Sequence, residues 1–213
     1  MAPKSGSIRD RRAIKKDDMS DATHPKSQSD LHRMTPEELG RLFPIILEKP
    51  SPKWPEVYRA ESLLIRKAFL ESEIIRMDHI GSTAIPNIKA KPTIDVLLQV
   101  SQGVKDQKII DIFESLGYQY IKPEDNPPPH MMFVKGYTIG GFEGQTCHVH
   151  VRYRGDWDEL YFRDYLISHP HMAKEYEGLK LELAARYRND REAYTNAKTP
   201  FVEKINRLAR GLT

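Results

Sequence analysis

The sequence predicts one domain of the α/β class, preceded by a polar tail. The chain has 213 residues, of which 39% are hydrophobic, and this suffices for the core of one domain of ordinary size. Short apolar runs typical of strands lie between segments whose apolar residues recur at helical spacing. The last third shows helical spacing alone, so we expect a helical C-terminal part.

The first 33 residues are polar and charged, and their few apolar residues follow no period. We therefore expect residues 1–33 to be a disordered tail and residues 34–213 to form the folded domain. The alternative is a basic arm that contacts nucleic acid or an acidic partner.

Helix signals follow the tail. Thr35 as N-cap, Pro36 at the first helical position and Glu38 at the capping-box position predict a short helix. After several prolines, Val57, Leu64, Ala68 and Phe69 indicate the buried face of a longer helix.

Strands and turns dominate the middle of the chain. Residues 74–80 suit a strand that runs into a Gly81-Ser82 turn, and residues 93–100 suit the next strand. In this second strand the even positions face the core, so Asp95 and Leu97 share the other face. Further elements are expected as a helix at 105–117, strands at 118–121 and 131–134 around a proline loop at 127–129, and a turn at 136–144.

Residues 146–153 predict a strong strand with two distinct faces. Cys147, Val149 and Val151 lie on one face, and His148, His150 and Arg152 lie on the other.

Three helices are expected at the C-terminal end. The first spans residues 157–168 and ends before Pro170, with Arg163 on an apolar face shared with Leu160 and Ile167. The second carries Lys180 on its apolar side. The Thr199-Pro200 pair predicts the start of the last helix, with Leu208 pointing inward.

Composition excludes several classes of protein. A formal charge of +3 is too small to indicate nucleic-acid binding by itself, and the single Cys147 excludes an internal disulfide framework and a zinc site built from cysteines. No apolar run has the roughly 18–20 residues that a membrane span needs, and the N-terminus lacks the apolar segment of a secretory signal. We expect a cytoplasmic protein without a membrane partner.

A phosphate site is the first functional hypothesis. The Gly81-Ser82-Thr83 turn offers backbone N–H groups and hydroxyls, and Lys89 and Lys91 lie between it and Asp95. The alternative is a simple cap between a strand and a short helix.

The carboxylate of Asp95 interrupts an apolar strand, so it needs a partner. It either pairs with Lys91 or Arg152, or acts as a metal ligand or a general base. His148 and His150 suit a divalent metal such as zinc or manganese, hydrogen bonds to a ligand, or a solvated strand face.

Two further cations, Arg163 and Lys180, are candidates for phosphate contacts. Each could equally be a member of a buried ion pair or a side chain that extends to solvent.

The chain resembles the GrpB family through several motifs in order. These are HIGSTAIP at 79–86, AKPTID at 90–95, HVH at 148–150, FRDYL at 162–166, Glu175 with Leu179-Lys180, and Tyr194, Lys198 and Phe201. That family is similar to the nucleotidyltransferase superfamily that includes DNA polymerase beta, so the resemblance implies a mixed sheet flanked by helices. Gly81 and Ser82 match the Gly-Ser pair of that superfamily and Asp95 its first carboxylate, whereas Leu97 stands where a second carboxylate would be.

The resemblance implies one of two functions. The first is transfer of a nucleotidyl or phosphoryl group to an unknown acceptor, with Mg or Mn on Asp95. Ser82, Asp95, His148 and His150 would then be catalytic, and Gly81, Ser82, Thr83, Lys89, Lys91, Arg152, Arg163 and Lys180 would bind phosphate. The second is an inactive module that binds a nucleotide or another phosphorylated small molecule, which the departure at Leu97 favours. Nucleic-acid binding through the tail is the least favoured hypothesis.

Overall fold

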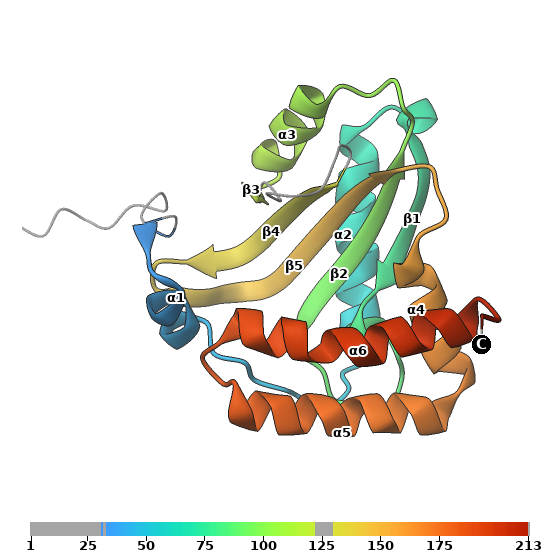
Figure 1. The fold of residues 1–213 in the computed structure, drawn as a ribbon. Helices are drawn as coiled ribbons and strands as arrows, with labels where there is room; N and C mark the ends of the chain where they lie inside the picture. The colour runs from blue at the N-terminus through green and yellow to red at the C-terminus, as the bar shows by residue number, and fades with distance from the viewer. Residues whose placement is uncertain (1–30, 32, 122–129, 213) are drawn as a thin grey trace, which may run out of the picture.

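A five-stranded mixed sheet forms the centre of the molecule (Figure 1). The computed structural model describes residue 31, residues 33–121 and residues 130–212. The predicted disordered tail lies almost wholly outside the described residues, as does the proline loop at 127–129. The expected α/β architecture with a helical C-terminal part is confirmed.

The strands follow the order β1-β2-β5-β4-β3 across the sheet. Only β2 and β5 are parallel, and the other neighbouring pairs are antiparallel. The strand bounds are β1 Ile74–Ile80, β2 Thr93–Val100, β3 Gln119–Ile121, β4 Met131–Thr138 and β5 Gly141–Tyr153.

The turn predicted at 136–144 is much shorter in the structure. β4 continues to Thr138 and β5 begins at Gly141, so only residues 139–140 form the turn. Gly136 has a φ of 88°, and it coincides with a register shift in β4, so the glycine accommodates a bulge within the hairpin.

One face of the sheet carries the main core, covered by α2 (Lys53–Ala68) and α3 (Asp106–Ser115). The even positions of β2, from Ile94 to Val100, are fully buried there, as predicted. The predicted buried face of α2 is wrong by one residue near the middle of the helix, where Ile65 is buried instead of Leu64. Leu64 is 46% exposed, whereas Ile65 is fully buried, because two adjacent leucines precede Ile65 and periodicity alone does not fix the helix rotation.

A short helix, α1 (Pro36–Leu42), begins at Thr35 with both hydrogen bonds of the predicted capping box. The Thr35 hydroxyl accepts from the Glu38 N–H at 3.2 Å, and the Thr35 N–H donates to the Glu38 carboxylate at 2.8 Å. The N-terminal signal read from the sequence is therefore correct.

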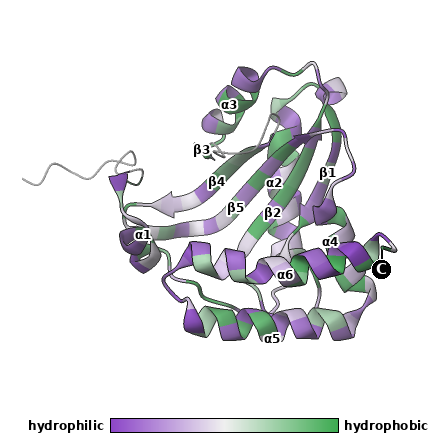
Figure 2. Cartoon of the chain, in the orientation of Figure 1, coloured by the Kyte–Doolittle hydropathy of each residue, from purple (hydrophilic) through white to green (hydrophobic). Residues whose placement is uncertain are grey.

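The C-terminal helices are α4 (Asp158–Ser168), α5 (Pro170–Arg186) and α6 (Arg191–Ala209). They pack on one another and on Ile85 and Ile88 to form a second core. Hydrophobic and hydrophilic residues are interspersed along α5 and α6 in Figure 2, as expected for helices with one buried face. Within the described part of the chain, no helix is both long and apolar enough to span a membrane.

Two details of these helices correct the sequence prediction. α6 starts at Arg191, with the Asp190 side chain as its cap, and Pro200 lies inside the helix instead of opening it. Leu208 is 42% exposed, and on α4 the buried residues are Phe162 and Leu166, so Arg163 does not lie in the apolar stripe.

Candidate functional site

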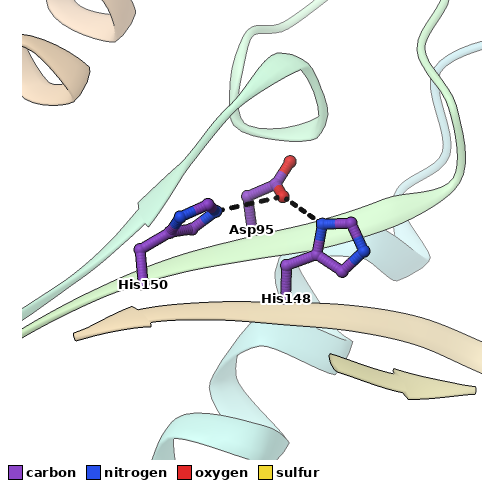
Figure 3. Close-up of side chains that lie close together, drawn as sticks. All are labelled: Asp95, His148 and His150. Atoms are coloured by element: carbon purple, nitrogen blue, oxygen red, sulfur yellow. Dashed lines mark ion pairs between the residues drawn. The ribbon is translucent and has the colours of Figure 1, made fainter. Parts of the chain in front are cut away.

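Two neighbouring parallel strands bring Asp95, His148 and His150 together. The register pairs Asp95 of β2 with His148 of β5 and Leu97 with His150, so all three polar side chains lie on the sheet face opposite α2 and α3. Asp95 Oδ1 lies 3.2 Å from His148 Nδ1 and 3.8 Å from His150 Nε2 (Figure 3). One ligand atom from each residue lies within 4.8 Å of the other two.

The Gly81-Ser82 turn closes over Asp95. Ile80 pairs with Asp95 across the sheet, and the chain then turns at Gly81 into a single 3-10 turn, η3 (Ser82–Ala84). Gly81 has φ 69° and ψ −173°, a region that is essentially restricted to glycine. A Cβ at this position would lie 2.3 Å from Asp95 Oδ2, so no larger residue fits between the turn and the carboxylate.

These residues line a pocket of about 600 Å³ between the sheet and the C-terminal helices. Its volume falls within the usual range for small-molecule sites. The predicted residues that line it are Gly81, Ser82, Lys91, Asp95, His148, His150 and Lys180.

Four cationic side chains converge on this pocket: Lys91, Lys180, Arg191 and Lys198. None of them forms an ion pair with a carboxylate of the described residues. Lys180 is buried and donates a hydrogen bond to the carbonyl of Lys89 at 2.5 Å, and the ammonium groups of Lys91 and Lys198 lie near the ring of Tyr194.

Burial, together with the crowding of cations, lowers the pKa values of the three lysines. Burial, together with the positive charges of Arg191 and Lys198, lowers the pKa of Lys91 to about 8. Burial and the charge of Lys198 lower the pKa of Lys180 to about 7. Burial also lowers the pKa of Lys198. An anion in the pocket would relieve this repulsion.

The carboxylates that line the pocket have partners elsewhere, with the exception of Asp95. Asp158 pairs with Arg210, and Glu159 pairs with Arg152. Burial alone would raise the pKa of Asp95, but the neighbouring imidazoles of His148 and His150 outweigh it and hold that pKa well below its usual range.

A chain of polar contacts orients His148. Burial lowers the pKa of His148, which favours the neutral ring. A neutral ring that donates from Nδ1 to Asp95 accepts at Nε2, and Nε2 lies 2.8 Å from the Tyr137 hydroxyl. Arg191 donates in turn to that hydroxyl at 3.4 Å. The ion pairs predicted between Asp95 and Lys91 or Arg152 are replaced by these histidine contacts.

Four predicted site residues lie outside the pocket lining. Thr83 is buried and donates to the Thr93 carbonyl, so its hydroxyl supports the turn. Lys89 contributes its backbone, which donates to Glu177 and accepts from Lys180. Arg152 and Arg163 form ion pairs with Glu159 and Asp78, and Arg163 also donates to the His79 carbonyl.

The pocket residues that the sequence prediction missed come mainly from α6. Arg191, Tyr194 and Lys198 recur at intervals of three and four, which places them on one face of a helix. This spacing was a usable signal, but the helix was predicted to start only at residue 199. Tyr176 of α5 also lines the pocket, where its hydroxyl forms a hydrogen bond with Ser82.

The donor set fits one metal ion. Leu97 is fully buried beside Asp95, so the second carboxylate of a two-metal site is missing, and two imidazoles take its place. Two histidines and one carboxylate suit manganese, iron or zinc, whereas Mg²⁺ prefers oxygen ligands. Of the two predicted ions, manganese therefore matches the nitrogen and oxygen donors better than magnesium does.

Several known proteins are similar to this chain. A family model described as GrpB protein matches residues 44–208. Glutamate-rich protein GrpB of Alkalihalophilus pseudofirmus is 34% identical over 169 residues, which cover 76% of this chain and 93% of that protein. A UPF0157 protein of Pseudomonas aeruginosa is 43% identical over 155 residues, and the match spans 72% of this chain but only 63% of the relative.

A solved structure gives the same result. The crystal structure of the conserved protein GrpB from Enterococcus faecalis matches with a TM-score of 0.67 and 30% sequence identity. The match covers 77% of this chain and 96% of that chain.

Proposed function

The chain belongs to the GrpB family, and from this premise and the geometry of the pocket we propose that it binds a nucleotide or another phosphorylated small molecule. In this proposal Asp95, His148 and His150 hold one divalent metal ion beside the phosphates. The reaction is the transfer of a nucleotidyl or phosphoryl group to an acceptor.

The convergence of unpaired cations carries this proposal. The pocket is faced by four cations, namely Lys91, Lys180, Lys198 and Arg191. Among the described residues, Asp95 is the one carboxylate of the lining that has no Lys or Arg partner. A ligand with several negative charges compensates the positive charge of these four side chains better than a neutral ligand does. Ser82 and the backbone at the Gly81 turn add hydrogen-bond donors of the kind that phosphate oxygens accept.

The proposed transfer follows from these roles. The acceptor oxygen forms a bond to phosphorus while the bond from phosphorus to the bridging oxygen breaks, and the bridging oxygen keeps the electron pair. It leaves as part of pyrophosphate when a nucleotidyl group is transferred, or as part of a nucleoside diphosphate when the terminal phosphoryl group is transferred. The proton of the acceptor hydroxyl passes to the solvent. The cations stabilise the charge that develops on the leaving group. A bound metal ion would supply Lewis-acid polarisation of a phosphoryl oxygen.

A second candidate function is binding without catalysis. Leu97 removes the carboxylate with which polymerase-type sites hold a second ion, and it is fully buried, so no water-accessible oxygen replaces it at this position. In this case the same pocket residues recognise the phosphorylated ligand, and no group transfer occurs.

Thermal unfolding tests the binding that both candidates share. With Mn²⁺ and ATP or tripolyphosphate at 100 times the dissociation constant, stability rises by roughly 2.7 kcal/mol, which corresponds to a midpoint shift of about 5–10 °C. We expect Lys198→Ala to abolish most of this shift and Lys204→Ala, an exposed site on the same helix, to keep it. The proposal fails if neither compound shifts the midpoint of the unchanged protein.

Turnover separates the two candidates. The protein is incubated with labelled nucleoside triphosphates, a panel of acceptors and either Mn²⁺ or Mg²⁺, and its products are compared with those of Asp95→Ala. If the unchanged protein transfers a labelled group and Asp95→Ala does not, the enzyme hypothesis is supported. We expect this transfer to be faster with Mn²⁺ than with Mg²⁺. If the unchanged protein binds the nucleotide but its turnover does not exceed that of Asp95→Ala, the protein is a binding module without catalysis.

A further inference from the structure

A second, smaller cavity opens beside the phosphate pocket. This side lobe has a volume of about 290 Å³ and shares three lining residues with the main pocket, namely Lys91, Thr93 and Arg191. The two cavities are therefore adjacent, and two cations stand at their junction. The side lobe is additionally lined by Pro44, Ile46, Glu48, Tyr137, Phe142 and Gln145.

The wall of the side lobe holds an exposed aromatic ring in a fixed position. Phe142 is 45% exposed although it is a large hydrophobic side chain. Its ring lies 5.2 Å from that of Phe43 and 5.6 Å from that of Tyr137, centroid to centroid. Two rings support it from within the protein, so it forms a platform on which a planar ligand group can stack.

Two polar side chains of the side lobe offer free hydrogen-bond acceptors. The Gln145 amide N–H donates to the carbonyls of Pro92 and Thr146, which leaves the amide oxygen without a hydrogen bond among the described residues. Glu48 is exposed and forms no ion pair with the described residues. Such acceptors match amino groups on the edge of a heterocycle, and the Glu48 carboxylate repels a phosphate chain.

We propose that the side lobe binds the base of a nucleotide whose phosphates lie in the main pocket, and that this base carries an exocyclic amino group. This inference rests on the proposed function, since it assumes that the main pocket takes the phosphates. Phe142 provides the stacking surface, Glu48 and Gln145 accept from the amino group, and Lys91 and Arg191 flank the passage between the two cavities.

Calorimetric titration in the presence of Mn²⁺ tests the stacking surface. ATP is compared with tripolyphosphate, which has the phosphates without the base. We expect ATP to bind the unchanged protein about tenfold more tightly, and Phe142→Ala to remove that advantage without changing the affinity for tripolyphosphate. Phe142→Trp retains a stacking surface and should keep the preference for ATP, and Leu208→Ala removes an exposed hydrophobic side chain outside both cavities and should also keep it.

The outcomes distinguish this inference from the proposed function. If neither compound binds, the proposed function fails. If both bind with equal affinity, or if Phe142→Ala weakens both alike, the phosphate pocket stands and the base site is refuted.

Inosine triphosphate tests the amino group. It carries a carbonyl where ATP carries an amino group, so this oxygen would face the acceptors of Glu48 and Gln145. We expect weaker binding than for ATP, with the difference reduced in Glu48→Gln, whose amide can donate. Equal affinities for the two nucleotides in the unchanged protein would overturn the assignment of the amino group.

Discussion

Gly81 determines how closely the turn after β1 approaches the Asp95 carboxylate. Its backbone conformation is nearly exclusive to glycine, and the space beside it is filled by Asp95 itself. Sequence reasoning identified the Gly-Ser turn and the carboxylate as neighbours. It did not identify the partners of Asp95, because pairing with His148 and His150 depends on a parallel alignment of strands that lie 53 residues apart.

We predict that Gly81→Ala disrupts the site. The backbone strain alone costs about 1–3 kcal/mol, and the added Cβ displaces the Asp95 carboxylate, so the affinity for Mn²⁺ should fall at least about tenfold. Gly103→Ala is the matched control, since a Cβ there meets no atom within 4 Å. Calorimetry with Mn²⁺ and urea unfolding provide the measurements. Unchanged Mn²⁺ affinity in Gly81→Ala would show that the turn does not position the metal ligand.

We predict that Lys180 gains a proton when a phosphorylated ligand binds. Burial and the charge of Lys198 lower its pKa to about 7, with Glu177 opposing and Lys91 adding to this shift, so the side chain is mostly neutral at pH 8. A bound phosphate raises this pKa, so binding at pH 8 takes up protons from the buffer. Titrations in buffers of different ionisation enthalpy measure the uptake. Lys180→Met should reduce the number of protons taken up on binding by a large part of one proton, whereas Lys204→Met, at an exposed site, should leave it unchanged. Equal proton uptake in the unchanged protein and both variants would contradict the protonation of Lys180 on binding.

Among the secondary-structure elements, the strands could be predicted because apolar and polar residues alternate between their two faces. The start of the last helix could not be predicted in this way. Thr199 and Pro200 resemble a cap and a first helical residue, but Asp190 caps α6 and Pro200 is tolerated inside it, where it removes one backbone hydrogen bond. Asp190 and Thr199 are both residue types that favour an N-cap, so the capping signals alone do not distinguish the two starts. As a consequence the face of α6 that carries Arg191, Tyr194 and Lys198 was not recognised.

We predict opposite effects on stability when two helical glycines, Gly40 and Gly178, are replaced by alanine. At Gly40 in α1, a Cβ would lie 1.7 Å from the backbone oxygen of Asn189, so Gly40→Ala should destabilise the protein by about 1–3 kcal/mol through a clash that backbone atoms cannot relieve. At the exposed Gly178 in α5, no atom lies within 4 Å of the added Cβ, and Gly178→Ala should stabilise by about 0.5–1 kcal/mol. Urea unfolding measures both. Similar effects of the two substitutions would contradict the docking of α1 on residue 189.

At the scale of the whole molecule, the pocket lies where two packed layers meet. The sheet supplies Asp95, His148 and His150, and the loop before β2 supplies Lys91. The helices α5 and α6 supply Lys180, Arg191 and Lys198. The fold class followed from periodicity, and the mixed sheet followed from the resemblance to a known family. The apposition of α6 and the sheet comes from tertiary packing over long sequence separation, which a single sequence does not encode in any local pattern.

A crystal structure of the protein with Mn²⁺ and ATP tests the central claim most directly, because anomalous scattering locates the ion and the density shows the phosphates. We expect one Mn²⁺ on Asp95, His148 and His150, with the triphosphate against Lys91, Lys180 and Lys198. A triphosphate bound outside this pocket, or a metal ion held by other residues, would contradict it.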